Sequence, residues 1–179
     1  MSNSQDQELI RRCQKGDRRA LEDLLMQYQR PIYNAAFRML GNAEDAADIT
    51  QTVFLRAFEH LDRYNPDYKF FSWIYRIAIN ESINQINRGK RELGLEDSQP
   101  ATTEGPVDHF QAEDASRRIQ DALMTLQEDF RMVIVLRHFS DLSYREISEV
   151  LHIPEITVKS RLYSARQRLK EELQEDGEP

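Results

Sequence analysis

The chain has 179 residues, of which 40% are hydrophobic and 31% are charged, and its formal net charge is −7. This length suits one domain or two small ones, and this composition favours helical bundles with wide polar faces. No apolar run has the length of a membrane span or of a signal peptide's central region, so we expect a cytoplasmic protein without membrane insertion.

Residues that carry reaction chemistry are sparse. Cys13 is the only cysteine, which excludes an internal disulfide and fits a reducing compartment. The four histidines have no metal-ligand spacing with cysteines or carboxylates. No glycine-rich phosphate loop, pair of acids or nucleophile motif stands out. We therefore expect no metal site, no cofactor and no enzymatic activity.

Helical periodicity runs through the first 41 residues. Gly16 interrupts it, and Asp17 can cap the helix that follows. Pro31 marks either a fresh helix start or a kink, because proline lacks an N–H. Gly41 fits the end of a helix. We expect this part of the chain to be scaffold.

Residues 43–61 predict an amphipathic helix that Asn42 can cap. Its apolar positions, such as Phe54 and Ala57, form a stripe that packs inward. Five polar residues remain for the outward face: Asp45, Asp48, Gln51, Thr52 and Arg56. Such a face is either solvated or a contact surface for a partner.

The segment from Asp62 to Arg91 is aromatic and basic, with six Lys and Arg against three Asp and Glu, a net charge of +3. A turn-rich loop precedes a helix that we expect from Trp73 to Asn87, closed by Gly89. Aromatic rings interleaved with Arg, Lys and Asn suit unstacked single-stranded bases. Because most of the rings are expected in the core, four residues are the better candidates for exposed function: Tyr68, Lys69, Arg76 and Asn80.

Periodicity stops across residues 92–111, which are rich in Gly, Pro, Ser, Thr and acids. This composition predicts a flexible linker. The linker divides the chain into an N-terminal domain, residues 1–91, and a C-terminal domain, residues 112–179. The sequence therefore predicts an all-α protein made of two small helical domains.

The C-terminal domain ends in two short helices with a tight turn between them. Ser143 and Glu146 can form a capping box for the first helix, and Pro154 prevents that helix from continuing. In the second helix, apolar residues recur on one face from Val158 to Leu169, and the other face is basic and rich in hydroxyls. This pattern predicts a helix-turn-helix.

Charge is unevenly distributed along the chain. From Arg131 to Lys170 there are eight Lys and Arg and four Asp and Glu, a net +4, whereas residues 171–179 hold five acids and no base, a net −5. Basic islands in an acidic chain suggest local phosphate contacts. We hypothesise that the acidic linker and tail mask the basic surfaces in the free protein.

Three stretches carry a family resemblance: residues 44–58 (EDAADITQTVFLRAF), residues 71–80 (FSWIYRIAIN), and residues 142–147 with 157–162 (LSYREI and TVKSRL). In this order they resemble the bacterial extracytoplasmic-function (ECF) sigma factors, which are two-domain initiation factors of RNA polymerase. The resemblance implies promoter recognition and transcription initiation, with core RNA polymerase and promoter DNA as partners. It also implies control by an anti-sigma factor.

The resemblance implies a role for each group of polar residues. The outward face of the 45–58 helix would dock on the polymerase through Asp45, Asp48, Gln51 and Arg56. The minus-ten element would be opened, with one base flipped out, by Asn65, Asp67, Tyr68, Lys69, Arg76 and Asn80. The minus-thirty-five element would be read in the major groove by Arg137, Tyr144, Lys159, Ser160, Arg161, Tyr163, Ser164 and Arg166.

The chain departs from the family pattern at five positions. Relatives often have Ala at Ser148, Gly at His152 and Ile156, Arg at Ser164, and Gly at Pro66. His152 must accept turn geometry that Gly adopts freely. The fold tolerates these changes, but the recognised promoter sequence does not carry over from relatives.

The alternative function is a stand-alone helix-turn-helix regulator that binds duplex DNA by itself. Such a regulator needs neither the aromatic segment 64–80 nor the polar face of the helix at 45–58. These two features therefore favour the sigma factor.

We expect Lys159→Ala and Arg161→Ala to weaken DNA binding in different ways. Lys159 is expected to reach bases, so its loss should reduce sequence discrimination. Arg161 is expected to hold a phosphate, so its loss should weaken binding to every sequence and flatten the salt dependence. Titrations with promoter and random DNA at several salt concentrations test this, and equal losses on both DNAs for both variants would contradict it.

Overall fold

The computed structural model describes residues 3–92 and 111–175, and these residues form an all-α structure in two parts. The first part contains α1 (Asn3–Gln14), α2 (Arg18–Leu40), α3 (Ala43–Glu59), the short η1 (Leu61–Arg63) and α4 (Phe70–Glu92). The second contains α5 (Gln111–Thr125), α6 (Glu128–Ile134), the π-helical η2 (Val135–Phe139), α7 (Tyr144–Leu151) and α8 (Glu155–Glu175). The all-α prediction is confirmed. Apart from its two end residues, the linker expected at 92–111 lies outside the described residues.

The predicted caps set the boundaries of the first helices. The Asp17 carboxylate accepts hydrogen bonds from the backbone N–H groups of the first turn of α2, and the Asn42 side chain does the same for α3. Gly41 ends α2 with φ 73°, a left-handed conformation that glycine adopts without strain. A Cβ at Gly41 would also meet the Met124 sulfur of α5 at 2.8 Å. The turn therefore favours glycine at position 41, and any larger residue there would also displace the Met124 side chain of α5.

The structure decides between the alternatives for Pro31 and corrects the expectation for Gly89. Pro31 does not start a new helix, because α2 runs through it. Tyr28 and Ile32, on either side of Pro31, are fully buried, and this packing holds the helix together across the missing N–H. Gly89 does not end α4, which begins at Phe70 and continues to Glu92. Lys90, in the last turn, forms a 2.5 Å ion pair with Glu128 of α6, so a contact distant in sequence extends the helix past the glycine.

The core of the first part is built around Tyr28. Its ring packs edge-on against Phe70 at a centroid distance of 5.3 Å. Its hydroxyl donates a 2.6 Å hydrogen bond to the Asp6 carboxylate, which ties α1 to α2. Burial and the neighbouring Asp6 raise the pKa of Tyr28, so the phenol stays protonated and remains a donor.

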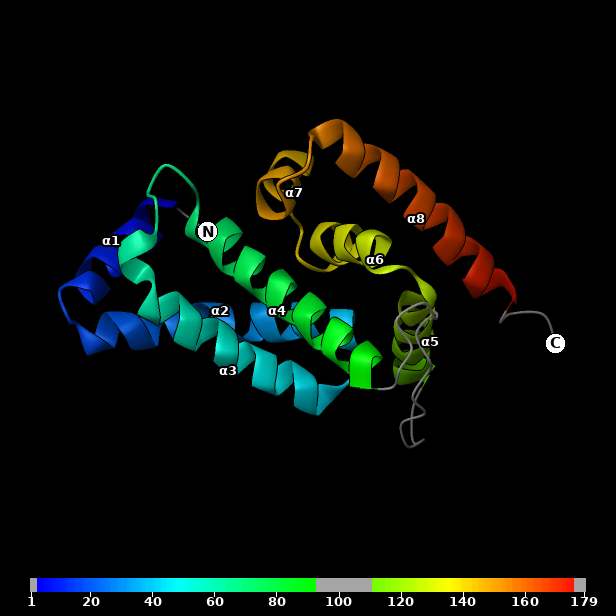
Figure 1. Cartoon of the computed structure of the whole chain (residues 1–179), viewed down its shortest axis with the longest axis horizontal. Helices are drawn as coiled ribbons and strands as arrows, with labels where there is room; N and C mark the ends of the chain where they lie inside the picture. The colour runs from blue at the N-terminus through cyan, green and yellow to red at the C-terminus, as the bar shows by residue number, and fades with distance from the viewer. Residues whose placement is uncertain (1–2, 93–110, 176–179) are drawn as a thin grey trace.

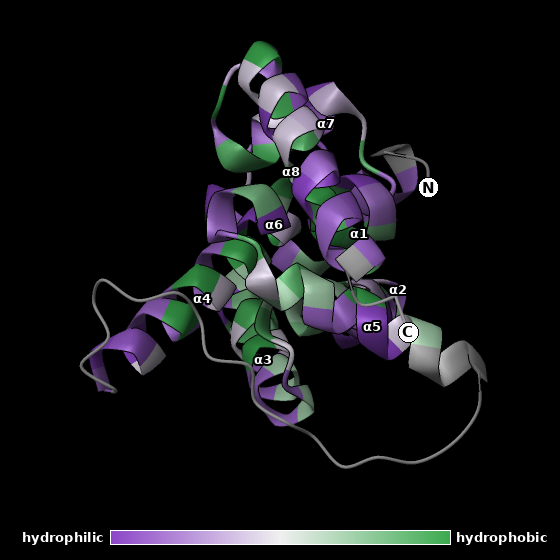
Figure 2. Cartoon of the chain, turned by 90° about the vertical axis from the view of Figure 1, so that its right-hand side faces the viewer, coloured by the Kyte–Doolittle hydropathy of each residue, from purple (hydrophilic) through white to green (hydrophobic). Residues whose placement is uncertain are grey.

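Hydrophobic and hydrophilic residues alternate along α3 and α4, as amphipathic helices require (Figure 2).

The helix-turn-helix forms as predicted. Ser143 and Glu146 make both hydrogen bonds of the capping box at the start of α7. His152 ends α7 with φ 53°, the left-handed conformation that a glycine would adopt more readily. The Ser148 hydroxyl donates a 2.6 Å hydrogen bond to the Ile153 carbonyl, so this departure from the family pattern closes the same turn.

The two parts pack against each other: α7 lies beside α4 (Figure 1), and α5, α6 and η2 contact α2. Arg131 of α6, only 3% exposed, joins them. Its guanidinium donates hydrogen bonds to the carbonyls of Met39 at the end of α2, at 2.7 Å, and of Met124 and Leu126, at 2.9 Å each. Burial lowers the pKa of Arg131. Within the described residues, no helix is long and apolar enough to cross a membrane.

Arg131→Met should destabilise the chain, because it leaves three buried carbonyls without their donor. We expect the free energy of unfolding to fall by about 2–4 kcal/mol. Chemical denaturation followed by circular dichroism measures this, with Arg63→Met at an exposed position as the control. A loss no larger than that of the control would contradict the bridging role.

Candidate functional site

The polar face of α3 forms one wall of a groove against α4. Asp48 and Gln51 are exposed, as expected, and line this groove of about 430 Å³. Asp45 is half-buried and accepts a 3.1 Å hydrogen bond from Gln85 of α4. Arg56 forms a 2.6 Å ion pair with Glu81, which is buried. The groove therefore has a fixed polar floor and a free acidic edge.

An apolar residue on this face was missed from the sequence. Leu55 is 64% exposed and lines the same groove. It stands seven residues after Asp48 and four after Gln51, a spacing that places all three on one face of a helix. The phase of the helix could have identified it, because positions 48, 51 and 55 of one helix share a face.

Three hydrogen bonds fix the conformation of the loop between η1 and α4. The Tyr64 hydroxyl donates to the Tyr68 carbonyl at 2.6 Å, and the Asn65 side chain accepts from the Asp67 N–H at 2.9 Å. Gln7 of α1 donates to the Pro66 carbonyl at 3.0 Å. Tyr64 is buried, whereas Asn65, Asp67 and Tyr68 are exposed. The loop therefore presents an aromatic ring, an amide and a carboxylate on a rigid base.

The basic residues beside this loop, Lys69 and Arg76, contact α7, although Lys69 remains partly exposed. Lys69 forms a 2.6 Å ion pair with Glu146. Arg76 donates to the carbonyls of Glu149, at 2.5 Å, and of Val150, at 3.3 Å. Desolvation by burial lowers the pKa of Arg76. Two of the residues predicted to contact minus-ten DNA are thus engaged by the helix-turn-helix.

The ion pair also affects Glu146. Burial by itself would raise the pKa of its carboxyl group, but hydrogen bonds from Lys69 and Ser143 outweigh burial and hold the pKa below its usual range. The stabilisation is present above the ordinary carboxyl pKa and is lost as the pH falls through the lowered value. At neutral pH the Glu146 carboxylate is therefore ionised and can pair with Lys69.

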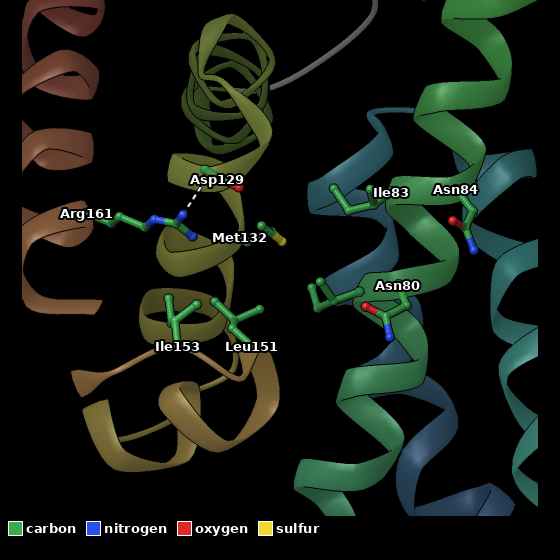
Figure 3. Close-up of a pocket in the computed structure, with 9 residues that line it drawn as sticks. Asn80, Ile83, Asn84, Asp129, Met132, Leu151, Ile153 and Arg161 are labelled. Atoms are coloured by element: carbon green, nitrogen blue, oxygen red, sulfur yellow. Dashed lines mark ion pairs between the residues drawn. The ribbon is translucent and has the colours of Figure 1, made fainter. Parts of the chain in front are cut away.

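A second groove, of about 550 Å³, lies between α4 and the second part of the chain (Figure 3). Asn80, Ile83 and Asn84 line it from α4, and residues of α6, α7 and the turn line the other side. The facing wall is apolar at Met132, Leu151 and Ile153 and carries an ion pair between Asp129 and Arg161. Asn80 is exposed and opens into this groove.

The outward face of α8 carries the residues predicted to read DNA. Lys159, Ser160, Tyr163 and Arg166 are exposed. Tyr144 of α7 lies 5.9 Å from Lys159 and 5.7 Å from Arg137, so two cations flank one ring. This array is basic and hydroxyl-bearing, and no hydrogen bond or ion pair joins it to the first part of the chain among the described residues.

Three further predicted residues point elsewhere or are held by the fold. Arg161 is half-buried, and its guanidinium forms a 2.5 Å ion pair with Asp129, as Figure 3 shows. Ser164 is half-buried as well. Arg137 donates to the Leu142 carbonyl at 3.0 Å. The partner Asp129 gave no signal in the sequence, because it lies 32 positions before Arg161.

His138 of η2 contacts Arg166, one of the exposed residues on the outward face of α8. Arg166 donates a 3.2 Å hydrogen bond from Nε to His138 Nε2. Burial and, next, the charges of Arg166 and Arg137 lower the pKa of His138. The imidazole is therefore neutral at neutral pH and can accept this hydrogen bond.

Comparison with known proteins gives matches over both parts. Residues 24–92 match the family model for Sigma-70 region 2, and residues 116–169 match Sigma-70, region 4. The chain is 36% identical to the ECF RNA polymerase sigma factor SigW of Bacillus subtilis, over 93% of this chain and 95% of that protein. The chain belongs to the ECF sigma factors. It is also 32% identical to the RNA polymerase sigma-H factor of Pseudomonas aeruginosa, over 97% of this chain and 96% of that protein.

Solved structures agree with this membership. CnrH, solved in complex with the cytosolic domain of CnrY, has a TM-score of 0.74 at 27% identity and covers 97% of this chain and 99% of its own. The sigma factor RpoE of Bartonella quintana, solved with the anti-sigma factor NepR, shares the fold with a TM-score of 0.70 at 24% identity, over 86% of this chain and 96% of its own. This sigma factor therefore directs promoter recognition and transcription initiation by RNA polymerase, as its motifs predicted, rather than acting as a stand-alone regulator.

Lys69→Glu should loosen the packing of the two parts, because it places two carboxylates together where the ion pair with Glu146 now stands. We expect the radius of gyration of the free sigma factor to increase, as measured by small-angle X-ray scattering at neutral pH. Arg63→Glu makes the same charge change at an exposed residue of η1 and should leave the radius unchanged. An unchanged radius for Lys69→Glu would contradict the contact in solution.

Proposed function

We propose that the two parts of this sigma factor divide promoter recognition between them. The N-terminal part, residues 1–91, binds core RNA polymerase and opens the minus-ten element. The C-terminal part, residues 112–179, reads the minus-thirty-five element. The chain acts by binding alone, without catalysing a reaction, and works in the cytoplasm together with the polymerase.

Polymerase binding is assigned to the α3 face. The free acidic edge formed by Asp48 suits arginine and lysine partners, and the Gln51 amide suits backbone groups. Leu55 adds an apolar centre to this polar rim, which is the usual anatomy of a protein interface. Asp45 and Arg56, held by Gln85 and Glu81, would position the rim rather than make its principal contacts.

Opening of the minus-ten element is assigned to the loop before α4. Extruding a base from the stack costs a few kcal/mol, which stacking and edge hydrogen bonds must offset. Tyr68 can stack on an exposed base, while Asn65 and Asp67 can bond to its edge. Lys69, Arg76 and Asn80 would follow the strand once α7 has moved away from them.

Reading of the minus-thirty-five element is assigned to the outward face of α8. Lys159, Ser160 and Tyr163 lie near the start of the recognition helix, where side chains reach base edges. Arg166 and Tyr144 flank them toward the phosphates. Arg137, Arg161 and Ser164 would contribute only after their present partners are released or as supports.

The separation of the two promoter elements, compared with the size of the compact chain, supports a closed and an open form of the chain. The two promoter elements are about 25 base pairs apart, which is about 85 Å at about 3.4 Å per base pair. A compact chain of this length is only about 40 Å across. Lys69 of the minus-ten surface and Glu146 of the helix-turn-helix are 2.6 Å apart here, so one closed molecule cannot engage both elements. We propose that the closed form is inactive and that binding to polymerase separates the parts.

In this mechanism, α7 masks the basic residues of the N-terminal part, a role that the sequence analysis assigned to the acidic linker and tail. Most of the acidic linker lies outside the described residues, and the described part of the tail, residues 171–175, forms the end of α8, whereas α7 contacts Lys69 and Arg76 directly. An anti-sigma factor is the proposed partner of the closed form. The groove between α4 and α6–α8 offers it an apolar wall with polar ends, and the related CnrH was solved with the cytosolic domain of CnrY.

Transcription in vitro tests the function. Purified core polymerase and a pool of genomic promoter fragments should yield new transcripts only when this chain is added. Asp48→Arg should reduce association with core polymerase by about tenfold or more, since it removes one favourable charge pair and adds a repulsive one. Glu171→Arg makes the same change on the distant end of α8 and should leave core binding intact.

Core binding by native gel shift and transcript yield should fall together in Asp48→Arg. Failure of the wild-type chain to associate with core enzyme, combined with tight binding to duplex DNA alone, would favour a stand-alone regulator.

A further inference from the structure

The recognition helix carries an exposed apolar residue that the fold does not use. Ile156 is the second residue of α8, and it is 72% exposed. The apolar residues that hold α8 in place, Val158, Leu162 and Ala165, are buried in contrast. Ile156 is therefore no part of the core, although its side chain is as large as theirs.

Helix stability does not explain Ile156 either. A β-branched residue loses side-chain freedom in a helix and is a poorer helix former than Ala, Glu or Lys. In the first turn, an acidic residue would also favour the helix dipole, as Glu155 does one position earlier. An isoleucine here costs helix stability and exposes apolar surface, which a contact that the free chain lacks would explain.

The position of Ile156 indicates which contact that is. Lys159, Ser160 and Tyr163 follow it at spacings of three, four and seven, which place them on the same face of the helix. Tyr163 is 68% exposed, so this stripe is free from end to end. In helix-turn-helix proteins, the first residues of the recognition helix approach base edges most closely. When this face of α8 enters the major groove, Ile156 would therefore be the residue of the face nearest the start of the helix.

The major groove offers one apolar group, the C5 methyl of thymine. We propose that Ile156 contacts the methyl group of a thymine in the upstream promoter element and so selects thymine at that position. This inference rests on the proposed role of α8 as the reader of that element.

The size of the effect follows from the size of the group. Transferring one methyl group from water into an apolar contact changes an equilibrium constant by about fourfold. A contact to a single thymine should therefore produce a preference of about fourfold, smaller than that of a bidentate side chain on a base pair. It should appear at one thymine, or at two that are adjacent.

Deoxyuridine provides the sharpest test, because it lacks only the methyl group of thymine. A promoter found with the holoenzyme in the transcription assay is synthesised with each thymine of its upstream element replaced, one at a time, by deoxyuridine. We expect wild-type holoenzyme to bind about fourfold more weakly when one particular thymine is replaced. Ile156→Ala holoenzyme should bind the unmodified promoter more weakly and lose no further affinity on that replacement.

Two control variants separate this contact from a general effect on the helix. Ile156→Val keeps a branched apolar side chain and should retain most of the sensitivity to deoxyuridine. Gln167→Ala truncates another exposed residue of α8 and should keep all of it. Circular dichroism of each variant, expected to match the wild type, verifies folding.

Two results would overturn the inference while leaving the sigma factor function intact. In one, Ile156→Ala holoenzyme remains as sensitive to deoxyuridine as the wild type; in the other, no thymine of the element shows any sensitivity. A holoenzyme that starts at no promoter would overturn the proposed function, and this inference with it.

Discussion

The contact between α4 and α7 is the constraint on which the rest of the arrangement depends. Arg76 donates to two carbonyls at the end of α7, and Lys69 pairs with the residue that caps its start. Both ends of one short helix are thus held by cations of the first part of the chain. Because the same cations belong to the predicted minus-ten surface, the proposed contact with DNA would compete with the contact to α7.

This competition gives the fold two uses for one set of charges. In the closed form, the guanidinium and ammonium groups satisfy carbonyls and a carboxylate within the chain, whereas on a promoter they would meet phosphates. Each contact is partly exposed and individually weak, which makes a switch between the two forms reversible. Arg131, in contrast, is fully buried against α2, so separation of the parts must break a stronger bridge as well. Core polymerase or another partner would have to supply that free energy.

Features decided within about ten residues were predictable from the sequence. Asp17, Asn42 and the Ser143–Glu146 capping box bond to backbone groups two or three positions away, so residue type and spacing suffice to identify them. Gly89 shows where this reasoning fails. A glycine followed by a basic cluster resembles a helix end, but the ion pair of Lys90 with Glu128, 38 positions on, carries α4 further.

The sequence by itself determined the helices, their buried faces, the helix-turn-helix and the family, because all of these are encoded by short-range periodicity, capping chemistry and local motifs. Only the tertiary structure decided which polar residues are free. In the folded chain, Arg161 forms an ion pair with Asp129 and Lys69 forms one with Glu146, whereas Leu55 and Ile156 are exposed. Those outcomes depend on how two separately encoded helical units pack together, and no pattern within either unit specifies that packing.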